Sequence, residues 1–446
     1  MKNVKIVLLL AMVAALGLSV IGCKKKSAGD GELRVLNYYD MTSANIVQEE
    51  PEIWAPFLKA NPDVKIVRED LFNDPFHNKV EAYAAAGQTP DVVYAWPSGR
   101  STSLHTQHLL KDLAPLVQKD GLQATYSKTA LDPAGQGANY IAMLPRAVTQ
   151  THAFFVNNEV LKAAGLTPAK TYAELKAQVP VLKAKGYETV IMPNQDTWVM
   201  QSCLFSAIAG RFGGAGWEQK ILSGQGKFTD KDFVDALTFI KTLYDDGVIA
   251  KSSVTLGYGE GPGQFATNKG AYYIDGDWRI GAFITDSSTG QALISPDRQP
   301  NFQVTVFPDI EGARLNKSTS GILGTGWGIS AAIPAGSAKE DAAWRLVKWL
   351  SGKEVQTFLL KTGGISTPTR TDIDTSALPL EPLQIAGTNL GKEYSTTTVV
   401  IDGVFAGPVY EPINDGLQAI GMGTQTPQQV AANAQRAFDA WKADQK

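Results

Sequence analysis

The chain has 446 residues, which is more than one ordinary hydrophobic core accommodates and predicts two or three domains. Hydrophobic residues make up 44% and charged residues 19%, a composition that excludes a disordered or fibrous chain. Because 41 basic residues nearly balance 44 acidic ones, the net charge of -3 offers no strongly basic surface, and we expect no nucleic acid partner.

Residues 1–22 have the pattern of a secretory signal peptide. Lys2 and Lys5 precede an apolar run over residues 6–18, which is shorter than the roughly 20 residues that a membrane-spanning helix needs. Small and apolar residues then lead directly to Cys23, an arrangement that resembles the lipobox of bacterial lipoproteins. The resemblance implies cleavage before Cys23 and a lipid attached to it. The alternative is an uncleaved membrane anchor in which Cys23 has no role.

Residues 23–31 are predicted to be the lipidated cysteine and a flexible tether, because residues 24–31 are charged or small and lack apolar periodicity. The chain has two cysteines, Cys23 and Cys203. If Cys23 is acylated, no disulfide can form within the chain, so packing must stabilise the fold. Apolar neighbours predict that Cys203 is buried and not a nucleophile.

The next elements alternate between strands and helices. Short apolar runs predict strands at 33–38, 64–68 and 91–94, with helices around 44–60 and 76–87 between them. This order indicates a mostly parallel α/β sheet.

A second α/β unit follows. A strand at 153–156 precedes a helix over 159–164 that ends at Gly165, a residue suited to a left-handed cap. Thr171 opens another helix with a capping-box pattern, and residues 189–192 form the next predicted strand. Near the C-terminus, Thr426 begins a further capping box and an amphipathic helix that must pack on a core.

Known catalytic and metal motifs are missing from the sequence. It contains no HExxH, paired CxxC, GxSxG or Walker-type phosphate loop. His105 and His108 are spaced to share a helix face, but no third ligand lies nearby in sequence, so we expect no metal. We also expect no cofactor and no catalytic residues.

Aromatic residues gather beside turns and polar groups at the ends of predicted strands. The clusters contain Tyr38 and Tyr39 with Asp40, then Trp96, Trp198, Trp278 and Trp327. Ligands of open α/β sheets bind outside the carboxyl ends of the strands. A sugar ring has apolar C–H faces and a hydroxyl rim, so flat aromatic platforms with polar neighbours suit it. The alternative for each ring is a place in the core.

Several motifs together resemble the family 1 extracellular solute-binding proteins of ABC importers, the maltose-binding-protein-like group. They occur in the expected order over about the whole mature chain: Phe76-x-x-Lys79, AAAGQTPDVV at 84–93, FFVNNEVL at 154–161, FATNKGAYYIDGDW at 265–278, GWGIS at 326–330 and WRLVKWL at 344–350.

The resemblance implies an α/β, periplasmic-binding-protein-like fold of two lobes, joined by a multi-crossing hinge, with a sugar in the cleft between them. The expected first lobe is 32–148 plus 319–366, and the second is 149–318 plus 367–446. It further implies that the sugar is delivered to the permease of an ABC transporter. We also expect a monomer that is exported and, through Cys23, lipid-anchored to the bacterial cell membrane.

Binding residues follow from the resemblance position by position. Trp278 matches the stacking tryptophan of the second lobe, and Trp96 falls where relatives place a cleft-facing residue of the first lobe. The remaining expected ligand contacts are Asp277, Tyr39 and Asp40 as polar partners, Trp327 as a further platform, and Asn194, Trp198, Tyr258 and Arg370 from loop position. Arg146 and His152 lie near the expected lobe crossing, where either reaches the ligand or fixes the hinge.

Three functions remain open on the sequence. The leading hypothesis is a carbohydrate receptor without enzymatic activity. The second is a secreted glycoside hydrolase, which needs two carboxyls about 5–10 Å apart across the scissile bond, with Asp277 and Asp40 as candidates. The third is a receptor for an anionic solute such as a sugar phosphate, clamped by Arg100, Arg279 or Arg370.

Overall fold

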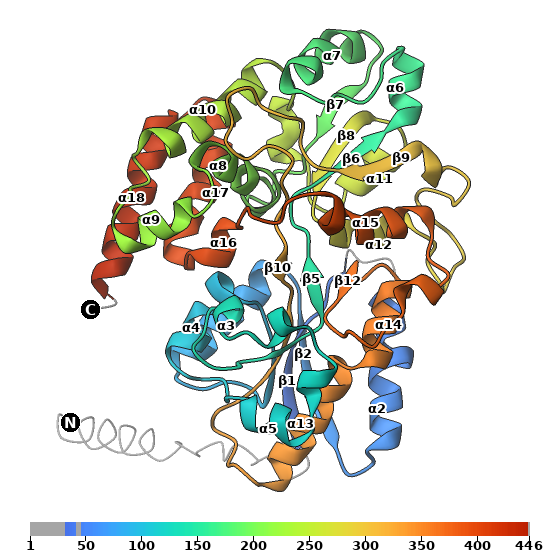
Figure 1. Cartoon of the computed structure of the whole chain (residues 1–446), viewed down its shortest axis with the longest axis vertical. Helices are drawn as coiled ribbons and strands as arrows, with labels where there is room; N and C mark the ends of the chain where they lie inside the picture. The colour runs from blue at the N-terminus through green and yellow to red at the C-terminus, as the bar shows by residue number, and fades with distance from the viewer. Residues whose placement is uncertain (1–31, 42–45, 445–446) are drawn as a thin grey trace, which may run out of the picture.

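The computed structural model describes residues 32–41 and 46–444. These residues form two lobes stacked along the long axis of the molecule, with short strands running between them (Figure 1). The expected signal peptide, Cys23 and the expected tether lie outside the described residues. No helix within the described residues is both long and apolar enough to cross a membrane.

The first lobe is built on a five-stranded sheet in the order β2-β1-β3-β11-β4. β1 pairs in parallel with β2 and β3, whereas β11 is antiparallel to β3 and β4, so the sheet is mixed. Its strands are β1 (Glu32–Tyr38), β2 (Lys65–Leu71), β3 (Val92–Ala95), β4 (Leu144–Pro145) and β11 (Gly326–Ile329). Its helices are α2 (Ala55–Ala60), α3 (Asp74–Ala85), α4 (Thr102–Thr106), α5 (Ala114–Lys119), α13 (Ala338–Leu350) and α14 (Lys353–Lys361).

The second lobe is built on a four-stranded sheet in the order β7-β8-β6-β9. Its strands are β6 (Ala153–Asn157), β7 (Glu188–Ile191), β8 (Gly270–Asp275) and β9 (Phe302–Thr305). Side chains alternate between the two faces: Phe154 and Tyr272 pack in one core, and Phe155 and Tyr273 pack in another on the opposite face. The surrounding helices are α6 (Asn158–Ala164), α7 (Tyr172–Ala184), α8 (Ser206–Gly213), α9 (Trp217–Ser223), α10 (Lys231–Asp245), α11 (Gly261–Ala266), α12 (Ile280–Phe283), α15 (Pro382–Glu393), α16 (Ile401–Val404), α17 (Gly407–Met422) and α18 (Pro427–Asp444).

Local signals place several of these elements where the sequence predicts them. Thr171 and Glu174 make the expected capping box of α7, and Gly165 ends α6 with a positive φ of 74°. Thr426 and Gln429 exchange the two hydrogen bonds of a capping box at the start of α18. Of the helix expected over 44–60, residues 46–60 are described, and they are helical as a 3-10 turn (Ile46–Gln48), a π-helical turn (Glu50–Trp54) and α2.

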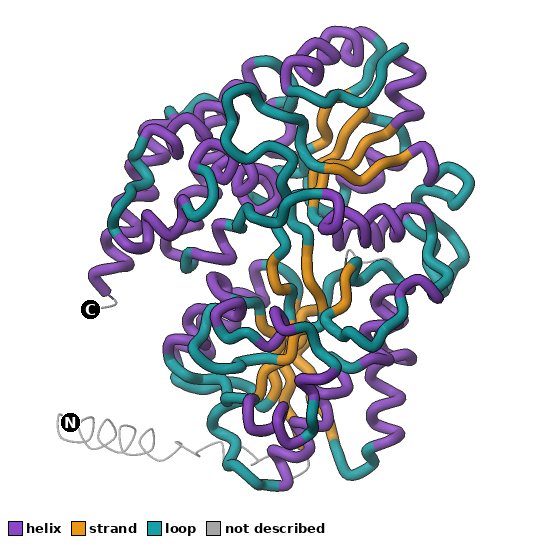
Figure 2. Tube along the Cα trace, viewed as in Figure 1, coloured by secondary structure: helices purple, strands orange, loops and turns teal. Residues whose placement is uncertain are grey.

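A small antiparallel sheet joins the lobes. β5 (Ala147–Thr149) lies between β10 (Ile322–Leu323) and β12 (Thr367–Pro368), and Figure 2 shows these strands between the two larger sheets. Ile373 and Leu378 still pack against the core of the first lobe, whereas Leu383 belongs to a core of the second. We therefore propose that the chain re-enters the second lobe after Leu378 and not at residue 367, where the sequence analysis set the boundary.

Candidate functional site

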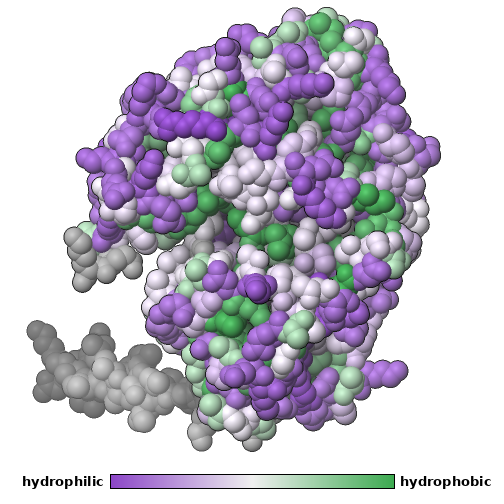
Figure 3. Space-filling model, in the orientation of Figure 1, coloured by the Kyte–Doolittle hydropathy of each residue, from purple (hydrophilic) through white to green (hydrophobic). Residues whose placement is uncertain are grey.

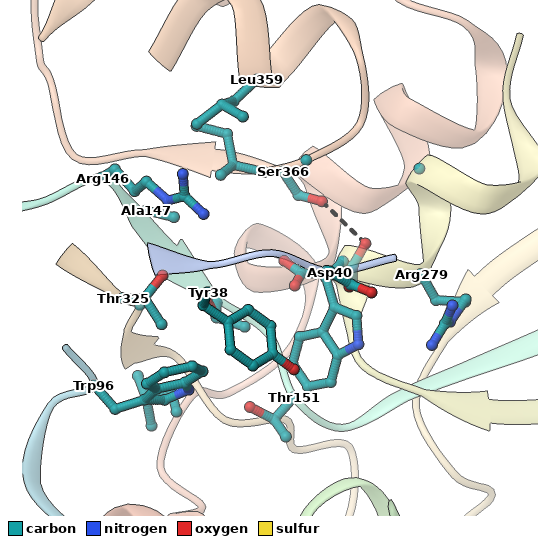
Figure 4. Close-up of a pocket in the computed structure, with 18 of the residues that line it drawn as sticks. Tyr38, Asp40, Trp96, Arg146, Ala147, Thr151, Arg279, Thr325, Leu359 and Ser366 are labelled. Carbon is teal, nitrogen blue, oxygen red and sulfur yellow. Dashed lines mark hydrogen bonds between the residues drawn. The ribbon is translucent and has the colours of Figure 1, made fainter. Parts of the chain in front are cut away.

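A cavity of about 240 Å³ lies between the two lobes and beside the connecting strands. Both lobes and the connecting strands contribute residues to its wall, and Figure 4 shows side chains from all three converging on one space. On one face of the molecule, hydrophobic residues gather at the junction of the lobes within a mostly hydrophilic surface (Figure 3). A concave site between lobes is where proteins most often bind small molecules.

The wall from the first lobe is aromatic. Tyr38 ends β1, and Tyr94 and Trp96 lie at the end of β3, so the carboxyl ends of two paired parallel strands bring the three rings together. The ring centroids of Tyr38 and Trp96 are 5.0 Å apart, and those of Tyr94 and Trp96 are 5.1 Å apart. All three residues line the cavity.

The opposite wall, from the second lobe, is also aromatic. Trp278 follows the end of β8, and Trp198 and Tyr258 pack beside it; all three line the cavity. The ring centroids of Trp198 and Trp278 are 6.4 Å apart. Gly276 is required here, because a Cβ at this position would lie 2.2 Å from the Trp278 ring. The indole therefore lies directly over the backbone that leads out of the strand.

Carboxyl groups share the cavity with the aromatic walls. Asp40, Glu49 and Asp277 line the cavity. Asp277 is 2% exposed, and its Oδ2 has no hydrogen-bond partner within residues 32–41 and 46–444. Burial raises the pKa of Asp277 to about 7. Burial also raises the pKa of Glu49 to about 7, although the charge of Arg146 lowers it. The cavity thus offers hydrogen-bond acceptors deep inside an apolar surround.

Each arginine considered for an anion clamp already has a carboxylate partner. Arg100 bonds Asp402 through Nε at 2.7 Å and Nη2 at 2.6 Å. Arg279 Nε lies 2.8 Å from Asp275, and Arg370 Nη2 lies 2.7 Å from Asp372.

Arg146 differs from these three arginines. It donates from Nη2 to the Tyr94 hydroxyl at 2.8 Å, with its guanidinium 4.9 Å from the centre of that ring. It lines the cavity beside Ala147, as Figure 4 shows. Arg146 is therefore placed to meet a ligand. His152, in contrast, does not line the cavity: it is 3% exposed and its ring forms a hydrogen bond with Thr398. Burial lowers the pKa of His152 to about 3.

Six of the ten residues expected at the site line the cavity, and four do not. Those that line it are Asp40, Trp96, Trp198, Tyr258, Asp277 and Trp278. Trp327 instead lies in the middle of the first-lobe sheet, 2% exposed, with its ring against Trp54 and Tyr94. Asn194 is fully buried and donates to the Tyr244 hydroxyl at 3.2 Å.

The structure also explains why the other two expected residues, Arg370 and Tyr39, do not line the cavity. Arg370 is held by Asp372 and lies 5.1 Å from the centre of the Tyr126 ring. Tyr39 does not line the cavity although its neighbour Tyr38 does, because successive side chains of an extended segment point to opposite faces. The tyrosine that lines the cavity at this strand end is therefore Tyr38, one residue before Tyr39.

The ligand contacts expected from the sequence did not include Tyr38, Tyr94, Glu49 or the connecting strands. Tyr38 directly precedes Tyr39, and Tyr94 lies two residues before Trp96, so their position at the ends of β1 and β3 was the available signal. Glu49 had none. The histidine pair offers no metal site: His105 is buried against the carbonyl oxygen of Trp96. The described part of the chain has no group of three or more His, Cys, Asp and Glu placed to hold a metal.

Direct contacts across the cleft hold the lobes together at its rim. The Arg100–Asp402 ion pair joins the first lobe to α16 of the second, and Asn73 Nδ2 donates to Asp196 at 3.0 Å. At Gly99 a Cβ would lie 1.9 Å from the carbonyl oxygen of Asp402, so the two backbones touch. The structure therefore shows the lobes closed over the cavity.

The buried Asp277 carboxyl gives a testable dependence of stability on pH. Its pKa is higher in the folded protein than the ordinary value of 3.8, so the folded state keeps the proton longer and loses stability as pH rises from about 4 to 7. Asp277→Asn cannot titrate. We expect the free energy of unfolding of the wild type, minus that of the variant, to fall by up to about 4 kcal/mol between pH 4 and pH 8. Urea unfolding at several pH values measures it, and a constant difference contradicts the burial argument.

Two α/β lobes with a cavity enclosed between them are typical of proteins whose lobes close around a small solute by a hinge. The profile of the family described as bacterial extracellular solute-binding protein matches residues 43–357, and the chain belongs to this family.

Similar proteins and structures are found at low sequence identity. The chain is 24% identical over 330 residues to a maltotriose-binding protein of Pyrococcus abyssi; the alignment covers 72% of this chain and 63% of that protein. A solved chitin oligosaccharide binding protein superposes with a TM-score of 0.80 at 20% identity, covering 93% of this chain and all of the other. A structure from work on xylan utilization by Caldanaerobius polysaccharolyticus gives 0.79 at 22% identity, covering 91% and 99%.

Proposed function

We propose that the protein is an exported carbohydrate receptor that closes on a neutral oligosaccharide and delivers it to the permease of an ABC transporter. The observation that carries the proposal is the pair of aromatic walls, Tyr38 with Trp96 and Trp198 with Trp278, which face one cavity from opposite lobes. Aromatic faces match the C–H faces of sugar rings, and the carboxyls between them accept hydrogen bonds from hydroxyl groups.

The charges of the cavity favour a neutral ligand over an anionic one. Arg100 and Arg279 are neutralised by their own carboxylate partners, and the remaining arginine of the cavity wall, Arg146, shares the space with Asp40, Glu49 and Asp277. Relatives named for maltotriose and chitin oligosaccharides support the sugar class. Because the family consists of binding proteins, we propose no catalytic step for these carboxyls and no cofactor.

A thermal-shift screen tests the ligand class. The panel contains maltotriose, triacetylchitotriose and xylotriose as neutral sugars, with glucose 6-phosphate and galacturonate as charged ones. We expect a neutral oligosaccharide to stabilise the protein, by about 2.7 kcal/mol at 100 times its dissociation constant. Stabilisation by the charged compounds alone contradicts the proposal. Release of new reducing ends from a neutral oligosaccharide indicates a hydrolase instead.

We further propose that Cys23 carries a lipid that holds the receptor, as a monomer, at the outer face of the bacterial cell membrane. The support is the sequence alone, because these residues lie outside the described part of the chain. We expect Cys23→Ser to abolish membrane attachment, since stable anchoring needs acyl chains and the tether has no amphipathic face. Detergent-phase partitioning of the expressed protein measures this. A variant that partitions like the wild type contradicts lipidation.

A further inference from the structure

Tyr258 lies behind Trp278 and is bonded to it. The indole Nε1 of Trp278 is 2.7 Å from the Tyr258 hydroxyl oxygen, and that hydroxyl is 3.3 Å from Oδ1 of Asp275. An indole N–H can only donate, so the tyrosine oxygen accepts from Trp278 and its own proton points to the carboxylate. The hydroxyl therefore links the tryptophan to a buried acid at the end of β8.

Asp275 is a firm anchor for this link. The residue is fully buried, and its side chain also accepts from the backbone N–H of Gly276 at 2.8 Å, from the Tyr273 hydroxyl at 2.6 Å and from Arg279 Nε at 2.8 Å. Such a fully bonded carboxylate has little freedom to move.

The ring of Tyr258 is fixed as well. The guanidinium of Arg279 lies 3.9 Å from its centre, the Trp198 ring packs edge-on with centroids 4.9 Å apart, and the backbone N–H of Tyr258 donates to Asp196 at 3.0 Å. Tyr258 is only 6% exposed, and burial raises its pKa well above the ordinary value, so the hydroxyl keeps the proton that it donates to Asp275.

We propose that Tyr258 is a positioning residue for Trp278. A tryptophan side chain has broad, roughly two-fold freedom about its outer torsion. The bond from Nε1 to Tyr258 selects one orientation of the indole, while Gly276 lets the ring lie against the backbone. The indole is thereby held with a fixed face toward the cavity before any ligand enters. This inference rests on the proposed function in taking Trp278 as a sugar platform.

Two single substitutions separate positioning from general stability. Tyr258→Phe keeps the ring that packs against Arg279 and Trp198 but removes the hydroxyl. Tyr273→Phe is the matched control, because it also removes one hydroxyl bond to Asp275 but has no hydrogen bond to Trp278. The first measurement is the indole N–H signal of Trp278 in the ligand-free, nitrogen-15-labelled protein, assigned by its loss in Trp278→Phe. The second is calorimetric titration with maltotriose, triacetylchitotriose and xylotriose.

We expect Tyr258→Phe to shift or broaden the Trp278 indole signal and Tyr273→Phe to leave it in place. For whichever of the three sugars binds the wild type, Tyr258→Phe should weaken affinity about five- to tenfold, while Tyr273→Phe binds within twofold of the wild type. The inference is overturned if the indole signal is unchanged in Tyr258→Phe, if both variants shift it equally, or if the shifted variant binds as tightly as the wild type. If none of the sugars binds the wild type, the proposed function fails, and the indole signal still decides whether Tyr258 positions Trp278.

Discussion

Trp278→Ala is expected to weaken binding of a neutral oligosaccharide at least thirtyfold while leaving the protein folded. A hot-spot aromatic at a binding site contributes about 2 kcal/mol or more to affinity. The Trp278 side chain is only partly buried, against the second-lobe core, and makes one hydrogen bond, to Tyr258. Its removal should therefore cost about 1–2 kcal/mol of unfolding free energy, less than truncation of a fully buried ring.

Trp327→Ala provides the matched control. This tryptophan is 2% exposed inside the first-lobe core and does not line the cavity. We expect it to lose about 3–5 kcal/mol of stability, while the folded fraction binds the sugar as the wild type does. Calorimetric titration and unfolding of the ligand-free proteins measure both quantities. If Trp278→Ala unfolds like Trp327→Ala and its folded fraction binds normally, then Trp278 is a core residue.

Asp402→Asn is expected to open the ligand-free protein. Arg100 and Asp402 belong to different lobes, and their side chains are 14% and 6% exposed in the closed structure. Removing one charge of a buried pair costs about 3–5 kcal/mol, because the other charge stays buried without its counter-ion. In an open arrangement Arg100 reaches water, so that cost falls on the closed state alone. The ratio of closed to open protein should fall by about a hundredfold or more.

Small-angle scattering measures this opening as a larger radius of gyration without ligand, and a saturating neutral sugar should restore part of the compaction. Asp372→Asn is the control, because the Arg370–Asp372 pair does not cross the cleft. Equal radii for Asp402→Asn and the wild type, or equal expansion in the control, would show that the interlobe pair does not hold the lobes closed.

Residues chosen because they follow predicted strands account for much of the cavity wall. Trp96 and Trp278 were selected because each follows a predicted strand, and the carboxyl ends of β3 and β8 do reach the cavity. Tyr39 follows the first predicted strand and Trp327 lies between two glycines, and neither lines the cavity. Strand alternation turned Tyr39 away, and pairing of β11 between β3 and β4 put Trp327 in the core.

The sequence by itself determined the family pattern, the two α/β units and local features such as the α7 capping box and the Gly165 helix end. These depend on contacts between residues a few positions apart, which composition and spacing reveal. Only the tertiary structure decided which aromatic faces meet across the cavity and that Arg100 is neutralised by Asp402, 302 residues further along the chain. Such pairings depend on strand register and on how the connecting strands set one lobe against the other, and neither has a signature in local spacing.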